Sequence, residues 1–305
     1  MIGNLLRYLN DRFPLQQYIP LALLMFTSIF AYCGVLDRTG ASFTFNEISI
    51  GGFFIVVLTF FLLRLFDELK DWKDDIENFP ERPISKGIIS IKTIRIISIL
   101  TIVTTVLIDY FFLNGIKFDF IYLILWAWLM RVEFYCSSFL RKHIFVYLVT
   151  HHFVMSLADF FIIRIYCVSR NKSLIPMYFL IILIFTCFTL ILELSRKIWS
   201  TKYEIKNYMT YSKAIGLDNA CSLVSIFSVI SFVVNIILVF RYLPVKYSVI
   251  VGILFTVIQV VFLYSVAKFK KTSCELRHYY LRDISALYVF LSMLVINSFY
   301  FISAS

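Results

Sequence analysis

Long runs of apolar residues alternate with short polar segments along the chain. A helix needs about 20 apolar residues to cross a hydrocarbon core of roughly 30 Å. Nine stretches reach that length, at about 17–36, 48–66, 89–110, 119–140, 143–163, 174–195, 214–240, 245–267 and 284–303. They are rich in Phe, Ile and Leu and poor in Gly and Pro, unlike the short alternating segments of a membrane β-barrel. The pattern predicts an all-α, polytopic membrane protein in which residues 1–305 form a single transmembrane domain.

Composition and charge support the same interpretation. Hydrophobic residues make up 60% of the chain and charged residues 16%, and the mean hydropathy is +0.84, as is typical of multi-pass membrane proteins. Most of the 29 basic residues fall in alternate loops, on the side that holds the N-terminus. This bias predicts an integral protein of the cytoplasmic membrane with its N-terminus in the cytosol and its C-terminus outside. The asymmetry and the attraction of anionic membrane lipid account for the net charge of +10, so we do not predict nucleic-acid binding.

A dense acidic segment adjoins the second apolar run. Residues 67–77 contain six carboxylates in eleven positions. If the segment is helical, Asp67, Asp71 and Asp75 lie at i, i+4 and i+8, where like charges repel unless a cation lies among them. Mg²⁺ held by a few carboxylates usually completes its shell with phosphate oxygens and water. We therefore predict a Mg²⁺ site and a phosphorylated or diphosphorylated ligand, with a solvated acidic loop as the alternative.

The acidic segment also resembles a known motif. It reads Asp67-Glu68-Leu-Lys-Asp71-Trp-Lys-Asp74-Asp75, followed by Arg82-Pro83-x-x-x-Gly87. This is similar to the first aspartate-rich motif of the UbiA superfamily of intramembrane prenyltransferases, usually Asn-x-x-x-Asp-x-x-x-Asp and then Arg-Pro-x-x-x-Gly. The family architecture of nine helices, with this motif in the cytosolic loop after the second, matches the whole chain. Asp67 stands where most members have Asn, which adds a charge to be balanced.

The second motif of the family departs from its usual form here. Members typically have Asp-x-x-x-Asp, whereas this chain has Glu193 and Lys197 at the two positions, followed by Thr210-Tyr211-Ser212-x-x-x-Gly216. We expect either one main Mg²⁺ site on the first motif, or direct binding of phosphate by Arg196 and Lys197. Tyr211 either touches phosphate or caps a helix, and the sequence leaves both open.

Ionisable residues within or near the predicted spans are further candidates. Asp67, Glu133 and Glu193 are all expected within two turns of the cytosolic ends of their helices. An ionisable residue in a span usually faces a cavity or a partner, so Glu133 could orient an acceptor or take its proton. The alternative is a structural ion pair of Glu133 with Arg131 or a neighbouring Lys. We expect His151 to be a hydrogen-bonded packing residue.

The resemblance implies Mg²⁺-dependent transfer of an isoprenoid chain from an allylic prenyl diphosphate to a lipophilic acceptor, aromatic or quinonoid, in a cavity that opens to the cytosolic side. It implies these roles: Asp67, Asp71 and Asp75 as metal ligands, Arg82, Arg196, Lys197 and Tyr211 as diphosphate ligands, and Glu133 and Glu193 as catalytic residues. The altered second motif keeps open a related terpene cyclase that ionises the diphosphate without an acceptor. A lipid or anion transporter is a further alternative, but we find no internal repeat with broken helices in matching positions.

Overall fold

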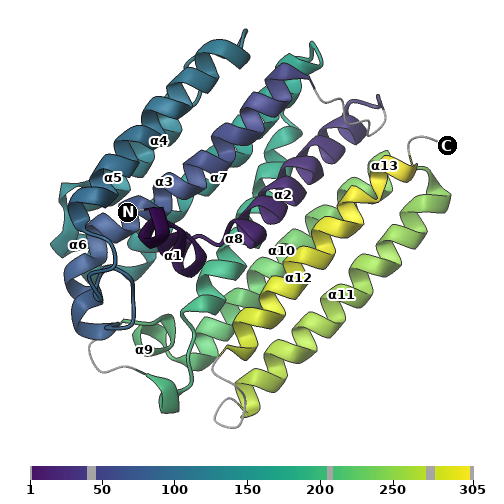
Figure 1. The fold of residues 1–305 in the computed structure, drawn as a ribbon. Helices are drawn as coiled ribbons and strands as arrows, with labels where there is room; N and C mark the ends of the chain where they lie inside the picture. Colours follow the sequence, from purple (N-terminus) through teal and green to yellow (C-terminus); the bar gives the residue numbers. More distant parts are fainter. Residues whose placement is uncertain (1, 40–45, 205–208, 273–278, 303–305) are drawn as a thin grey trace. The chain divides into compact units, whose positions relative to one another are not determined.

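The computed structural model describes residues 2–39, 46–204, 209–272 and 279–302, and every regular element in these ranges is a helix (Figure 1). The chain divides into two compact units. The first unit comprises residues 1–26 and 44–174, and the second comprises residues 27–43 and 175–305. Helix α2 (Leu15–Leu36) contributes its first half to the first unit and its second half to the second. The expectation of a single functional domain stays a prediction.

Eight of the described helices are long and apolar enough to cross a membrane. They are α2 (Leu15–Leu36), α3 (Glu47–Asn78), α4 (Ile91–Phe112), α7 (Ile144–Ser169), α8 (Tyr178–Arg196), α10 (Leu217–Tyr242), α11 (Val245–Thr272) and α12, which starts at Tyr280. The predicted all-α, multi-pass membrane architecture is therefore confirmed. The remaining predicted stretch, residues 119–140, is not one continuous span, and its apolar helix α5 (Ile121–Arg131) is too short to cross a membrane.

A left-handed turn interrupts that stretch. The turn η1 (Glu133–Tyr135) has φ angles of 48°, 51° and 54° at its three residues, a conformation that costs non-glycine residues about 1–2 kcal/mol each. Helix α5 is consequently about 16 Å long, at 1.5 Å per residue, or half of a hydrocarbon core. The short helix α6 (Ser137–Lys142) then leads into α7. No Gly or Pro marks the break, so the sequence reads as one continuous span.

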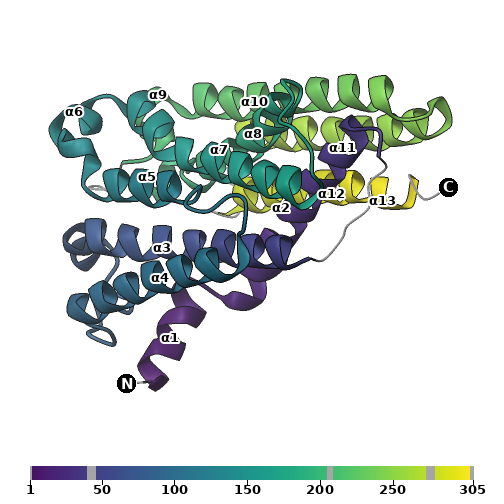
Figure 2. The same ribbon diagram turned by 90° about the horizontal axis from the view of Figure 1, so that it is seen from above.

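Helix α3 is the centre of the first unit, packing against α4, α5 and α7. Figures 1 and 2 show α3 and α4 running side by side. Two glycines permit the close approach: a Cβ atom on Gly51 would lie 2.6 Å from Phe112 Cβ, and one on Gly52 would lie 2.3 Å from Ile165 Cδ1. Small residues at such contacts let helix backbones pack closely in membranes.

The acidic segment is the C-terminal end of α3. Asn46 caps the start of the helix by accepting a hydrogen bond from the Ser49 backbone N–H at 2.9 Å. The 32 residues of α3 span about 48 Å, which is longer than a hydrocarbon core, so the helix has length to spare beyond the bilayer. The helix ends at Asn78, because Pro80 disfavours the helical conformation at the preceding residue, Phe79. Asp67, Asp71 and Asp75 therefore lie on one helix, which is the condition under which their spacing places them on a shared face.

The second unit is built from α8, α10, α11, α12 and the second half of α2. Short elements complete it: η2 (Thr201–Tyr203), α9 (Tyr211–Ile215) and α13 (Phe299–Ile302). Buried polar side chains join its long helices: the Tyr288 hydroxyl donates to Gln259 Oε1 at 2.9 Å, and Gln259 Nε2 donates to Ser228 Oγ at 3.0 Å. The Tyr32 hydroxyl likewise bonds to Asn235. Such bonds stabilise helix pairs where no water can serve as partner.

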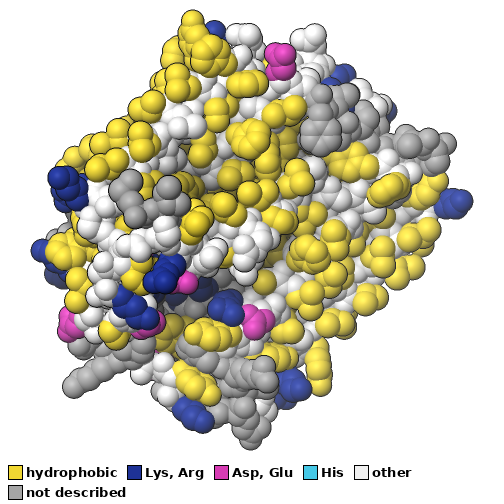
Figure 3. Space-filling model, viewed as in Figure 1, with side chains coloured by type: hydrophobic (Ala, Val, Ile, Leu, Met, Phe, Trp, Pro, Cys, Tyr) yellow, Lys and Arg dark blue, Asp and Glu magenta, His cyan; other side chains and the backbone are white. Residues whose placement is uncertain are grey.

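The surfaces of the helices are apolar, as a lipid environment requires. In the face shown in Figure 3, hydrophobic side chains cover α4 in the first unit and α11 in the second, while charged side chains lie mainly toward helix ends. Ile99, Leu100 and Phe111 of α4 are each more than half exposed. A contiguous surface of this kind is stable in contact with acyl chains rather than water.

Candidate functional site

Asp67 and Asp71 form a half-exposed carboxylate pair at the acidic end of α3. They lie one helical turn apart, and their side chains are 47% and 46% exposed. The ammonium of Lys70 forms ion pairs with both carboxylates, with Nζ 3.8 Å from Asp67 Oδ1 and 3.7 Å from Asp71 Oδ1. The structure therefore brings these two predicted metal ligands together, with a basic side chain beside them.

Glu68 and Asp75, seven residues apart, are instead buried and engaged by arginines. Glu68 Oε1 accepts from Arg12 Nε at 2.5 Å and from Arg64 Nη2 at 3.2 Å. Asp75 accepts a hydrogen bond from Arg82, and Arg12 Nη2 lies 3.9 Å from Asp75 Oδ2. Among the residues that the structure describes, no three Asp, Glu, His or Cys side chains are grouped closely enough to hold a metal ion. Asp75, the third predicted metal ligand, is thus bound to arginines rather than grouped with Asp67 and Asp71.

Helix α1 (Ile2–Arg12) is fixed to this buried side of α3. Tyr8 packs in a hydrophobic cluster with Leu65, Ile84 and Ile89, which belong to α3 and to the loop that follows it. Burial, reinforced by the charge of Glu68, raises the pKa of Tyr8, so its phenol stays neutral. Arg12 adds its ion pairs at the end of the same helix. The contact between α1 and the acidic segment could not be predicted, because no pattern in residues 2–12 points to α3.

Arg82, the predicted diphosphate ligand of the Arg-Pro-x-x-x-Gly segment, lies against the end of α3. Its guanidinium donates to Asp75 and lies 3.8 Å from the centre of the Phe79 ring. Ser85 Oγ donates to the Asp75 backbone oxygen at 3.3 Å. The loop that carries Arg82 is therefore held by the acidic helix itself.

Helix α7 reaches the carboxylate pair through Tyr147. Lys70 Nζ donates to Tyr147 Oη at 3.0 Å, and the Tyr147 ring stacks on His151 at 3.8 Å between centroids. His151 Nδ1 is hydrogen-bonded to the Tyr147 backbone oxygen at 3.1 Å, in agreement with the expected packing role. Lys70 could have been found from its spacing of three residues to Asp67. Tyr147 lies 77 residues away from Lys70 and gives no local signal.

Glu133 lies outside any long helix, in the left-handed turn η1, where its side chain is partly buried. It therefore differs from the predicted position near the end of a continuous span. The neighbouring Arg131 places its guanidinium 5.6 Å from the centre of the Phe66 ring. Strained backbone of this kind is frequent at functional sites, although the catalytic role of Glu133 stays a prediction.

In the second unit, the two altered residues of the second motif bind each other. Glu193 Oε1 lies 3.1 Å from Lys197 Nζ, at the i, i+4 spacing of a helix. Its other oxygen, Oε2, accepts from Arg196 Nη2 at 2.6 Å. Lys197, which replaces the usual acidic residue, thus converts this part of the motif from an acidic pair into an ion-pair cluster.

The segment after Lys197 folds back around Glu204. Glu204 accepts from Thr210 Oγ1 at 2.7 Å and from Ser212 Oγ at 2.6 Å. Between them, Tyr211 is buried and donates its backbone N–H to the Lys197 oxygen at 3.0 Å. Glu204 could not be predicted from the sequence, because its partners lie six and eight residues away and no single helix joins them to it.

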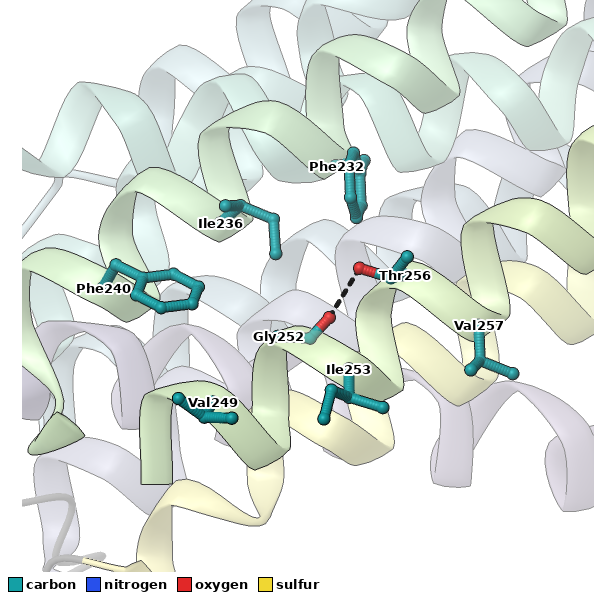
Figure 4. A pocket seen from close by; sticks show the side chains of 8 residues that line it. All are labelled: Phe232, Ile236, Phe240, Val249, Gly252, Ile253, Thr256 and Val257. Carbon is teal, nitrogen blue, oxygen red and sulfur yellow. Dashed lines mark hydrogen bonds between the residues drawn. The ribbon is translucent and has the colours of Figure 1, made fainter. Parts of the chain in front are cut away.

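An apolar hollow of about 360 Å³ lies between α10 and α11 (Figure 4). It is lined by Phe232, Ile236, Phe240, Val249, Gly252, Ile253, Thr256 and Val257. The Thr256 hydroxyl donates to the Gly252 oxygen at 2.7 Å, so the polar atom of the lining side chains is already paired. The hollow contains none of the predicted site residues.

Comparisons with known proteins identify the fold. The sequence matches no protein-family model and no curated protein. The structure is similar to that of a digeranylgeranylglyceryl phosphate synthase, with a TM-score of 0.65 and 12% identity over 99% of each chain. Two UbiA homologues also match, each over 92% of this chain and 98% of its own length. The homologue from Aeropyrum pernix K1 has a TM-score of 0.64 and 12% identity. The homologue from Archaeoglobus fulgidus, bound to GPP and Mg²⁺, has a TM-score of 0.56 and 14% identity. The structural similarity establishes a shared fold, and at 12–14% identity it establishes the fold alone.

Proposed function

We propose that this chain, whose fold is that of the UbiA homologues, is an intramembrane prenyltransferase that transfers an isoprenoid chain from an allylic diphosphate to a lipophilic acceptor. The observation that carries the proposal is the half-exposed pair Asp67 and Asp71 at the end of a membrane-length helix, followed by the Arg82 loop. A homologue of the same fold binds GPP and Mg²⁺. An acidic helix end of this kind suits a metal-bound diphosphate rather than a lipid headgroup alone.

The donor set fits one divalent cation. Asp67 and Asp71 offer two carboxylates on one face, which is a common protein share of a Mg²⁺ shell whose other ligands are water and phosphate. Asp75 would join them as the third predicted ligand by releasing Arg82. When bound there, Mg²⁺ would neutralise the negative charge that develops on the leaving diphosphate.

The second unit offers basic side chains of its own for a phosphate group, the predicted ligands Arg196 and Lys197. Arg196 and Lys197 carry two positive charges against the single carboxylate of Glu193, which leaves one net charge for an anionic ligand. Arg196 is half exposed, so it can exchange Glu193 for a phosphate oxygen, and its planar guanidinium suits two phosphate oxygens at once. In this proposal Glu193 positions Arg196 and Lys197 through its ion pairs with them. Tyr211 lies beside Lys197, to whose backbone oxygen it donates a hydrogen bond.

The reaction breaks the C–O bond between the allylic carbon and the diphosphate. The resulting allylic cation is protected from water among the apolar spans, where aromatic faces stabilise it. The acceptor then attacks the cation and loses a proton, for which Glu133 is the proposed base. We propose that the chemistry takes place at the cytosolic side of the cytoplasmic membrane, with the N-terminus in the cytosol.

The ion pair between Glu193 and Lys197 favours one alternative, a terpene cyclase of the same fold. A cyclase ionises the same diphosphate but needs no acceptor, and the altered second motif leaves fewer acidic residues to organise a second metal. The two reactions share the ionisation step and differ in the need for an acceptor and in their products.

The test is to incubate purified protein with Mg²⁺ and allylic diphosphates of increasing chain length, with and without aromatic or quinonoid acceptors. Mass spectrometry of the lipid extracts then identifies the products. A conjugate of acceptor and prenyl chain supports transfer, whereas a hydrocarbon or alcohol formed without acceptor supports cyclisation. Intact diphosphate under all conditions contradicts both.

A further inference from the structure

The Lys70 side chain is more deeply buried than the side chains of Asp67 and Asp71, with which it forms ion pairs. Its side chain is only 10% exposed, whereas those of Asp67 and Asp71 are about half exposed. Three oxygens surround its ammonium: the two carboxylate oxygens at 3.8 and 3.7 Å and Tyr147 Oη at 3.0 Å. The Tyr147 ring, with its centroid 5.5 Å away, adds a cation–π contact.

This position has a direct electrostatic consequence. Two carboxylates one helical turn apart repel each other, and a positive charge within 4 Å of both removes most of that repulsion. A divalent cation that binds the same pair must either displace the ammonium or share the carboxylates with it. Both cost free energy, so the pair with Lys70 present binds a metal more weakly than the two carboxylates would alone.

The same arrangement recurs at the other motif acids that the structure describes. Asp75 is bound by Arg82, and Glu193 is bound by Lys197 and Arg196, each within its own unit. The chain therefore neutralises these acidic residues with its own cations. Lys70 is distinct because its carboxylate partners stay accessible to a ligand.

We propose that Lys70 is a resident counter-ion, meaning a side-chain cation that occupies the place of a metal between Asp67 and Asp71 until substrate binds. It weakens binding of a divalent cation to the empty protein. When a diphosphate arrives, the ammonium transfers to a phosphate oxygen and the carboxylates become available, so metal and diphosphate bind together rather than in sequence. The second half of this inference rests on the proposed function, whereas the first half does not.

The test measures binding of Mn²⁺ alone, from the electron paramagnetic resonance signal of the free ion, to purified protein in detergent. The variants are Lys70→Met, which removes the charge, and Lys70→Arg, which keeps it. Lys73→Met is the matched control, because it removes the same charge from an exposed position three residues along α3, where the ammonium lies over the Trp72 ring.

We expect Lys70→Met to bind Mn²⁺ about tenfold more tightly than the wild type, since it removes a positive charge from within 4 Å of the ligands. Lys70→Arg should stay close to the wild type, and Lys73→Met should change by less than about threefold, because exposed charges at greater distance are screened. Equal or weaker binding by Lys70→Met than by Lys73→Met would overturn the proposal.

A second variant and a second ligand complete the test. Tyr147→Phe removes only the hydroxyl that accepts the hydrogen bond of the Lys70 ammonium, so it should tighten Mn²⁺ binding modestly. If Lys70→Met does not fold, this variant tests the same inference, and unchanged Mn²⁺ binding would overturn it. Without metal, Lys70→Met should bind a non-hydrolysable allylic diphosphate analogue more weakly than Lys73→Met does, and an equal affinity would refute the transfer of Lys70 to phosphate. Absence of prenyl transfer by the wild type would refute the proposed function and leave the Mn²⁺ result standing.

Discussion

Neighbouring basic side chains determine which acidic residues of the α3 segment remain accessible to a ligand. Asp67 and Asp71 remain half exposed beside Lys70, while Glu68 and Asp75 are buried against Arg12, Arg64 and Arg82. Sequence spacing identified the acidic helix and its shared face, but it could not divide the residues into these two groups. The division depends on Arg12, which lies 56 residues away from Glu68.

Replacing Asp71 with Ala should reduce turnover by at least about 100-fold, the usual cost of losing one group that stabilises charge in the transition state. The protein should remain monodisperse in detergent, because Asp71 is half exposed. Asp74→Ala is the matched control: it removes an exposed carboxylate from the same helix and should retain most of the activity. Near-normal turnover of Asp71→Ala would exclude this residue from the site.

Lys197 gives a prediction for the second motif. If its ammonium contacts the diphosphate, Lys197→Ala should raise the apparent KM for the diphosphate about tenfold with little loss of kcat, because a uniform binding contact is removed. Lys202→Ala, an exposed lysine in the same segment, should leave KM unchanged.

The reverse experiment restores the usual acidic residue of the family. Lys197→Asp places a second carboxylate beside Glu193 and removes a cation, so we expect lower activity than in the wild type. A faster enzyme with a steeper Mg²⁺ dependence would show instead that position 197 is a metal-ligand position, and would contradict our account of this motif.

At the scale of helices, hydrophobic runs predicted nine membrane spans, and eight of them are long apolar helices in the part of the chain that the structure describes. They did not predict the left-handed turn at Glu133–Tyr135, because residues 131–136 contain no Gly or Pro and are individually compatible with a helix. Next to the break, α5 contacts α7 through a long-range hydrogen bond, in which Trp126 Nε1 donates to the Thr150 oxygen at 2.8 Å. Long-range contacts of this kind leave no periodic signal.

Helix α1 should contribute to stability through its ion pairs. Arg12→Gln leaves the buried Glu68 with Arg64 alone, and removing one partner of a buried ion pair costs about 3–5 kcal/mol. Because Arg64 remains, we expect the lower end of that range and a clear fall in the thermal unfolding temperature in detergent. Arg7→Gln, an exposed change on the same helix, should have no measurable effect. Equal unfolding temperatures for the two variants would show that the Arg12 ion pairs do not stabilise the fold.

For the whole molecule, composition and hydropathy predicted the all-α polytopic architecture, and the structural similarity to a UbiA homologue over 92% of the chain agrees with it. The division into two compact units could not be predicted, since α2 crosses from one unit to the other without a linker or a change in composition. The cytosolic location of the N-terminus rests on the distribution of basic residues and remains a prediction.

The most direct test of the central claim is release of inorganic diphosphate from an allylic diphosphate by the protein in liposomes with Mg²⁺. Release reports ionisation of the substrate and does not depend on the identity of the acceptor. We predict release by the wild type that matches the lipid-soluble prenyl product mole for mole, and at least about 100-fold slower release by Asp71→Ala. The account would be contradicted by wild-type protein that binds the allylic diphosphate but releases no diphosphate with any chain length or acceptor.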